Sequence, residues 1–411
     1  MTKSFSRSAF NVDSAGSLLL ILFGFTLPLS VAVNNLFALL IILLWFYKKE
    51  YKRTWKIIKS SKVVIAVLVL FSLHIIGLLW TEDLALGLKM VRKGWMFLLL
   101  PIMMSFVKRE HIKYYISAFL LAISISELFS YLIWFEVIPP FLRATVYNPT
   151  PFIHHTSYNP FLAFAVYLTA YYMLFDKTLS KMQKILLVLF FATMSVNMFI
   201  TGGRAGQVGY FVVLMILFFQ FFNQHFFRAL FLSVLFLGAV LFTAYSSSQI
   251  FQDRAKQMVS QVQNYHIDKN SSTGLIQNSV GLRINFAVNT FEIIKEHPLI
   301  GVGTGGYEKN YKIINDKNSP NAEVHAHPHN MYLYEMVQFG IFGLISLLSI
   351  LYFQVRFAWN ETDRLRSKVG IALPLLFSVI MLSDSYLLGH FTTMLFVFFS
   401  AFLYRPFNEA D

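Results

Sequence analysis

No cysteine occurs among the 411 residues of this chain. The absence excludes a disulfide, a thiolate metal site and a thiol nucleophile, and it leaves the redox compartment open. Charged residues are also scarce, at 13%, while 56% of the residues are hydrophobic and 17% are aromatic. Together with a mean hydropathy of +0.58, this composition excludes the soluble classes and indicates a polytopic membrane protein.

Other common patterns are missing too. The chain shows no internal repeat and no low-complexity segment, and its many apolar stretches do not resemble a cleavable signal peptide followed by a soluble chain. Acidic residues number 21 against 34 lysines and arginines, which gives a formal charge of +13. We expect no nucleic-acid partner, because the basic residues lie between apolar segments and not on a soluble face.

The apolar stretches predict an all-α membrane protein with about 12 transmembrane helices. Residues 1–244 hold the first nine of these helices and residues 331–411 hold the last three. Between them, residues 245–330 form a hydrophilic segment with room for helices of its own. The loop 48–62 carries seven basic residues, so the positive-inside rule assigns it to the cytoplasm. Both termini are then cytoplasmic, and segment 245–330 is a large loop on the outer face.

Several basic residues lie in short outer loops, against the positive-inside rule: Lys89, Arg92, Lys93, Arg143 and Arg204. Lys89 and Arg92 are three positions apart in a predicted amphipathic helix, so they share one face. That face can meet phosphate groups of a substrate or lipid headgroups, and the sequence does not distinguish the two.

Arg204 lies in a tight turn, Ile200-Thr-Gly-Gly-Arg-Ala-Gly206, where one predicted helix ends and the next begins. The N-terminus of a helix is positive, so an arginine there favours a bound anion. Glycines at 202, 203 and 206 would let the backbone approach such a ligand closely. The alternative is an arginine that reaches toward lipid headgroups. Arg283 lies near the start of another predicted helix. Considered alone, it is best interpreted as an ordinary solvated arginine.

A glycine-rich stretch, Gly301-Val-Gly303-Thr-Gly-Gly306, matches the pattern GxGxxG. A dinucleotide site would also need a preceding strand, a following helix and an acidic residue about 20 positions later. We expect instead a turn, including Gly303, that shapes the floor of an outer pocket.

Three histidines alternate just before an apolar helix, at positions 325, 327 and 329. Alternation in an extended segment places them on one face, as metal ligands require, but the sequence shows no obvious carboxylate cluster to match them. One of them as a general base is the preferred interpretation, and a capping and packing role is the alternative. Asn330 is a good N-cap for the helix that follows.

Glu127 and Asp384 are acids within or near apolar stretches. Ionisable groups are costly there and are functional more often than not. Alternatively, each is the intramembrane partner of a basic or hydroxyl group.

These motifs occur in an order that resembles the O-antigen ligase and O-antigen polymerase superfamily, closest to O-antigen ligase. The resemblance covers about residues 200–347. It rests on four motifs that follow one another along the chain: Gly202-Gly-Arg204-Ala-Gly, Arg283, Pro298-Leu-Ile-Gly-Val-Gly303 and His327-Pro-His-Asn330. A helix that contains several glycines, with Glu335 to Gly343, follows the last of them.

The resemblance implies a fold like that of the GT-C glycosyltransferases, in the bacterial inner membrane, with a periplasmic active site. It implies transfer of a glycan from undecaprenyl pyrophosphate to a sugar hydroxyl of lipid A-core, with inversion and with neither a metal nor a cofactor. Arg204 and Arg283 match the family arginines that bind the pyrophosphate, and His329 matches the proposed base. Lys89 and Arg92 are added to the pyrophosphate set, and the possible supporting residues are His327, Asn330, Gly303, Glu127 and Asp384.

Two other functions stay open. A polymerase of the same superfamily would join repeat units of O-antigen or exopolysaccharide on the lipid carrier. A lipid-linked sugar flippase or transporter is a weaker alternative, because transporters tend to have internal repeats and broken helices at the midplane. In this chain the polar residues of interest lie at the outer surface instead. Membrane lipids are partners under every interpretation.

Overall fold

A computed structural model gives the fold and describes residues 11–222, 225–247, 252, 253, 255–257, 259, 260, 262, 263 and 279–407. The described residues are helical apart from turns and one isolated bridge between Thr145 and Asn148, which confirms the predicted all-α class. The first ten residues, residues 264–278 within the predicted outer loop and the last four residues lie outside the described part. The predicted cytoplasmic location of both termini therefore stays a prediction.

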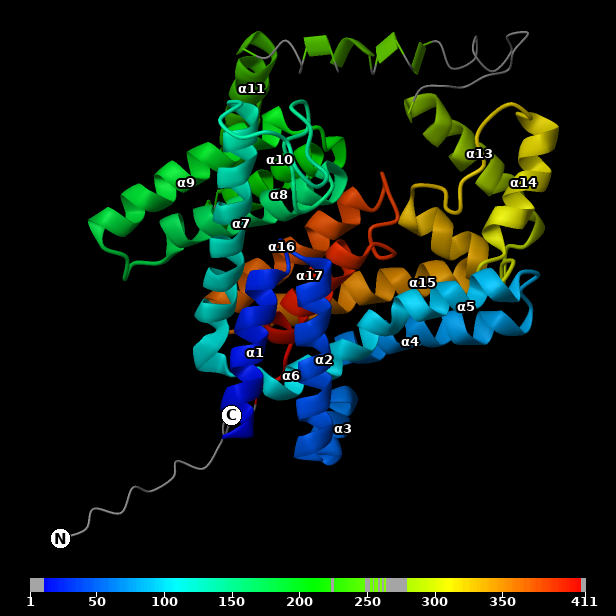
Figure 1. Ribbon diagram of the computed structural model, residues 1–411, viewed down its shortest axis with the longest axis horizontal. Coiled ribbons are helices and arrows are strands. Elements are labelled where there is room, and N and C mark those ends of the chain that lie inside the picture. The colour runs from blue at the N-terminus through cyan, green and yellow to red at the C-terminus, as the bar shows by residue number, and fades with distance from the viewer. Residues whose placement is uncertain are drawn as a thin grey trace.

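The helices carry the labels of Figure 1 and follow one another along the chain. They are α1 (Val12–Thr26), α2 (Val31–Lys48), α3 (Tyr51–Ser60), α4 (Lys62–Ile76), α5 (Leu84–Lys93), α6 (Leu99–Phe106), α7 (Ile112–Trp134), α8 (His155–Phe175), α9 (Lys181–Ile200), α10 (Arg204–Phe221), α11 (Phe226–Ser247), α13 (Ser279–Glu296), α14 (Tyr307–Asn318), α15 (Met331–Trp359), α16 (Arg364–Ile380) and α17 (His390–Leu403).

Seven segments in the described part of the chain are long and apolar enough to cross a membrane: Val31–Lys48, Lys62–Leu79, Arg109–Trp134, Lys181–Ile200, Arg204–Phe221, Phe226–Thr243 and Met331–Trp359. Two shorter apolar helices, α1 and α17, accompany them. The chain is thus a multi-pass membrane protein. Its count of about 12 spans and its likeness to the GT-C fold stay predictions.

The burial of the helices divides them into a centre and a periphery. Most residues of α8 and all but one of α17 are buried, so these two helices form the middle of the bundle. By contrast, α9 and α11 are apolar but mostly exposed, as helices that face lipid are. Figure 1 shows α9 projecting from one side of the molecule.

Two helices of the predicted outer loop, α13 and α14, pack against the first half of α15, at the right of Figure 1. Phe286, Tyr311 and Val337 are buried together in a small separate core. Beside it, the amide of Asn285 donates to Asn315 Oδ1 at 3.2 Å. Buried amides with partners on another helix fix how the two helices lie against each other.

The glycine-rich turn 301–306 lies between the end of α4 and α15 and forms hydrogen bonds with both. Thr304 donates a side-chain hydrogen bond to the His74 carbonyl at 2.7 Å and a backbone one to the Gly77 carbonyl at 3.1 Å. On the other side, the Gly303 N–H donates to the Gln338 carbonyl at 2.9 Å. The turn therefore clasps the end of α4 to the middle of α15.

The long helix α15 is kinked at Gly340, where the sequence predicts one continuous span over 331–355. Gly340 has φ 59° and ψ −145°, a conformation that is essentially restricted to glycine. A Cβ atom at Gly340 would lie 2.2 Å from the backbone of Leu299, and the Ile341 N–H donates to the Pro298 carbonyl. The kink thus lets segment 298–306 cross close to α15.

We expect Gly340→Ala to lower the free energy of unfolding by about 2 to 5 kcal/mol, because a side chain there adds backbone strain and a clash. SDS-induced unfolding of the purified protein measures the change. Gly238→Ala on α11 is the control, since nothing lies within 4 Å of its Cβ position. Equal stability of the two variants would contradict the role given to the kink.

Candidate active site

Three helices begin around one cavity of about 530 Å³. These are α8 at His155, α10 at Arg204 and α13 at Ser279. The free N–H groups and the positive ends of helices attract anions. The cavity, named the arginine cavity, is lined by His155, Thr156, Gly202, Gly203, Arg204, Ala205, Val208, Val280, Arg283, Val379, Leu382, Ser383, Asp384 and Tyr386.

Arg204 and Arg283 both line this cavity although they are far apart in the sequence. Arg204 is the first residue of α10, as the tight turn predicts, and its side chain is half-buried. Arg283 lies in the second turn of α13. Burial raises the pKa of Tyr386, the charge of Asp384 adds to that rise, and the positive charge of Arg283 opposes it. Two guanidinium groups and three helix N-termini give the cavity the chemistry that suits an anion with several charges.

The glycines around Arg204 serve mainly to bring two helices together. A Cβ at Gly203 would lie 2.6 Å from the His155 carbonyl, and one at Gly206 would lie 2.4 Å from the Asn159 backbone. These contacts place α10 directly against α8. Gly202 and Gly203 also line the arginine cavity, so close approach of their backbone to a ligand stays a prediction, while the contacts of Gly203 and Gly206 with α8 give these two glycines a packing role as well.

At the edge of the cavity, His329 Nδ1 donates a hydrogen bond to Asp384 Oδ1 at 3.1 Å. Burial would raise the pKa of Asp384, but the hydrogen bond and charge of His329 outweigh it and lower that pKa. Asp384 is then ionised at neutral pH and holds the imidazole proton on Nδ1. The free lone pair of His329 is therefore on Nε2, which can accept a proton from a bound hydroxyl.

The position of His329 is fixed from both sides. Its backbone has φ 51°, in the left-handed region that few residues adopt, and its ring stacks on Phe286 at 5.6 Å between centroids. The next residue, Asn330, caps α15 by accepting from the N–H groups of Tyr332 and Leu333, which confirms the predicted N-cap. The Asn330 side chain also donates to the Leu382 carbonyl at 3.1 Å.

We expect Asn330→Ala to lower the free energy of unfolding by about 1 to 2 kcal/mol through loss of the cap. Asn330→Asp keeps the capping oxygen and should retain most of the stability. Unfolding midpoints in SDS compare the three proteins. An alanine variant as stable as the aspartate variant would show that the cap contributes little.

His327 lies beside the His329–Asp384 pair and is neutral. Its ring centroid is 4.3 Å from that of His329, and its Nδ1 accepts from the His329 N–H at 3.4 Å. Burial and, to a smaller extent, the charges of His329, His325 and Lys93 together lower the pKa of His327 to about 4, against the opposing effect of Asp384.

This pKa predicts a pH dependence of stability. An unfolded histidine has a pKa of about 6.5, so between pH 6.5 and 4 the unfolded chain binds more protons at His327 than the native one does. The free energy of unfolding should therefore fall as the pH falls, by about 1 to 2 kcal/mol at pH 5. Unfolding at pH 7.5 and pH 5.0 should show a smaller fall for His327→Gln, and equal falls would contradict this interpretation.

Three ligand atoms at this place have the spacing that a divalent cation requires. One atom each from His327, His329 and Asp384 lies within 4.8 Å of the others. Asp384 is thus the carboxylate partner of the histidines. The sequence does not reveal this partnership, because Asp384 follows His329 by 55 positions. His325 pairs instead with Glu323 at 3.0 Å.

Four other predicted site residues lie elsewhere. Lys89 and Arg92 are exposed on α5 and do not line the arginine cavity. Gly303 belongs to the turn that clasps α4 to α15 and does not form the floor of that cavity. Glu127 is buried on α7 beside Thr193 of α9, which agrees with its alternative role as the partner of a hydroxyl group.

Two residues near the site were not assigned from the sequence. His155 lines the arginine cavity as the first residue of α8, and Lys93 is close enough to His327 to influence its pKa. Lys93 does carry a signal in the sequence, because it is one of the basic residues in short outer loops. The pair His154 and His155 carries no comparable signal.

The fold and this site define a multi-pass membrane protein with a cavity lined by two arginines and a histidine–carboxylate pair at one end of its helices. Residues 189–348 match the family model described as O-antigen ligase, and this match supports the similarity to the O-antigen ligase and polymerase superfamily. The resemblance predicted over about residues 200–347 is confirmed. The match includes Arg204, Arg283 and His329, whereas Asp384 lies beyond it.

The family match supports an enzyme of the ligase and polymerase kind. It implies a lipid-linked glycan and a lipid-anchored acceptor as substrates in general. No curated protein matches the chain.

Proposed function

We propose that the protein is an O-antigen ligase of the bacterial inner membrane, which transfers a glycan from undecaprenyl pyrophosphate to a sugar hydroxyl of lipid A-core in the periplasm. The observation that carries the proposal is the meeting of Arg204, Arg283 and the His329–Asp384 pair at one cavity. The arginines suit a diphosphate, and the histidine suits a hydroxyl. The two halves of a glycosyl transfer thus have adjacent sites.

In the proposed reaction, His329 Nε2 takes the proton of the acceptor hydroxyl as its oxygen attacks the anomeric carbon from the face opposite the diphosphate. The bond from that carbon to the diphosphate oxygen breaks, and the configuration inverts. Arg204 and Arg283 stabilise the charge that develops on the leaving group, as a metal ion would in other transferases. Asp384 keeps the imidazole in the reactive tautomer and stabilises the imidazolium that forms.

A lipid-linked donor also agrees with the walls of the cavity. Val208 of α10 and Val379 of α16 form its apolar side. Farther along the same two helices lies a second cavity of about 610 Å³, whose lining includes Met215, Phe219 and Leu375. We place the polyprenyl chain along this seam between α10 and α16, with its diphosphate at the arginines.

The test is transfer by the purified protein in detergent, with glycan-loaded undecaprenyl pyrophosphate and lipid A-core as substrates. We expect glycosylated lipid A-core without any ion gradient and with the same rate in EDTA. Loss of activity in EDTA would contradict the metal-independent mechanism and point to a metal at His327, His329 and Asp384. If no covalent product forms, the transferase proposal is contradicted and the transporter becomes the favoured alternative.

The same assay separates the ligase from the polymerase. A polymerase would lengthen the glycan on its lipid carrier when lipid A-core is omitted, whereas a ligase would leave the donor unchanged. Longer carrier-linked products in that reaction would replace the ligase proposal with the polymerase.

A further inference from the structure

A second polar cavity lies at the opposite ends of α15 and α16 from the arginine cavity. It has a volume of about 510 Å³ and is formed by the start of α4, the end of α15, the start of α16 and the chain that follows α17. The basic loops gather at this end of the helices, and the positive-inside rule assigns it to the cytoplasm. Nothing in the proposed transfer reaction uses this cavity.

One arginine of the cavity is part of its wall. Arg366 is buried and pairs with Glu361 at 2.7 Å. It also donates to the carbonyls of Leu403 and Arg405, and its guanidinium lies 4.7 Å from the Phe407 ring centroid. Its charge is balanced, so Arg366 fixes the start of α16 to the end of the chain and contributes little to binding.

The charges of Lys62 and Arg356 are not balanced in this way. In the described part of the chain, neither has a carboxylate within 4.0 Å, and the nearest partners are the Phe353 ring, 5.9 Å from Lys62 Nζ, and the Tyr352 hydroxyl, 2.9 Å from Arg356. A third cation, Arg109, is mostly exposed and lies 3.9 Å from Asp363. Three cations from three different elements therefore line a cavity whose one acid, Glu361, already has a partner.

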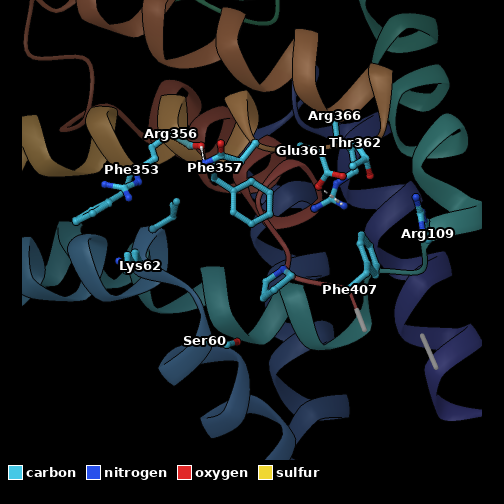
Figure 2. A pocket seen from close by; sticks show the side chains of 13 residues that line it. Ser60, Lys62, Arg109, Phe353, Arg356, Phe357, Glu361, Thr362, Arg366 and Phe407 are labelled. Carbon is cyan, nitrogen blue, oxygen red and sulfur yellow. Dashed lines mark hydrogen bonds and ion pairs between the residues drawn. The ribbon is translucent and has the colours of Figure 1, made fainter. Parts of the chain in front are cut away.

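Aromatic rings form the apolar part of the same cavity. Figure 2 shows the Phe357 ring in the middle, with Lys62, Phe353 and Arg356 on one side and the Arg366–Glu361 pair on the other. Cations that merely mark the cytoplasmic side of a membrane protein do not need such a cavity. A hollow with cations at its rim and phenyl rings within suits a ligand that has an anionic head and an apolar chain.

We propose that this cavity binds the headgroup of an anionic phospholipid from the cytoplasmic leaflet. Lys62 and Arg356 would contact the phosphate, and the first carbons of the acyl chains would lie along Phe353 and Phe357. Basic pockets between transmembrane helices at the cytoplasmic side are suited to such headgroups. The bound lipid would hold α4 beside α15 and α16, three helices that meet at this cavity.

Native mass spectrometry of the delipidated protein with phosphatidylglycerol or phosphatidylethanolamine tests the proposal. We expect phosphatidylglycerol to bind the wild type more tightly, and the double variant Lys62→Ala, Arg356→Ala to bind it roughly 30-fold more weakly, from about 1 kcal/mol per cation. The double variant Lys52→Ala, Lys56→Ala removes the same charge from α3, and neither of these lysines lines the cavity. It should bind within about twofold of the wild type.

Equal weakening in both double variants would overturn the proposal, because the effect would then come from general surface charge. Displacement of phosphatidylglycerol by millimolar inorganic phosphate would also overturn it, in favour of a soluble phosphate ligand. A melting curve of each variant without lipid shows that it is folded, so that a loss of binding is not a loss of structure.

Discussion

We expect His329→Gln to lower the rate of glycan transfer by about 10² to 10⁴, the usual contribution of a general base. Glutamine has a similar length and can still contact Asp384, so the variant should fold while it lacks a group that takes up the proton. Transfer from lipid-linked donor to lipid A-core, measured with both substrates saturating, gives the effect on kcat. The fall should appear in kcat more than in KM, because the imidazole acts in the transition state.

His325→Gln is the matched control for this change. Its ring centroid is 5.4 Å from that of His329, but it pairs with Glu323 and not with Asp384. We expect the control to keep activity within about threefold. A folded His329→Gln protein that transfers glycan at more than a tenth of the normal rate would exclude His329 as the base.

The second large effect is expected at the arginines. Arg204→Ala and Arg283→Ala should each lower kcat/KM by roughly 10² to 10³, the loss found when one charge-stabilising donor is removed. Lysine at either position keeps the charge but not the two-pronged contact with phosphate, so it should restore only part of the activity. The double alanine variant should lose less than the product of the single effects, because the two residues act on one leaving group.

Arg143→Ala provides the control for charge alone. Arg143 is exposed in the predicted outer loop before α8 and does not line the arginine cavity, so we expect nearly normal turnover. If Arg143→Ala is as impaired as Arg204→Ala, the arginines act by general attraction of the donor to the surface. Normal activity of folded Arg204→Ala would remove the diphosphate site from this cavity.

The sequence predicted the local features of the site well. The start of α10 at Arg204 and the N-cap at Asn330 each depend on a few neighbouring residues whose chemistry is visible in the chain. The helical class follows from apolar stretches in the same way. These features need no knowledge of what lies next to them in space.

Features that depend on contacts between distant segments were missed. The partnership of Asp384 with His329 joins two turns that are linked only by α15 and α16, and no periodicity encodes it. Arg283 has the sequence pattern of an ordinary surface arginine. Its importance comes from the cavity that it shares with Arg204 of α10, a residue far from it in the sequence. The kink at Gly340 was hidden because a glycine in an apolar run also fits a straight helix, and only the approach of Leu299 requires the unusual backbone.

The clasp made by Thr304 has a consequence for biosynthesis. Its carbonyl partner, His74, precedes it by 230 residues, which a ribosome adds in roughly 10 to 50 s. For that time the end of α4 is already made but its hydrogen-bonding partner does not yet exist. The early helices must therefore enter the bilayer with that carbonyl unsatisfied or hydrated, and the final architecture can close only after Thr304 has been translated.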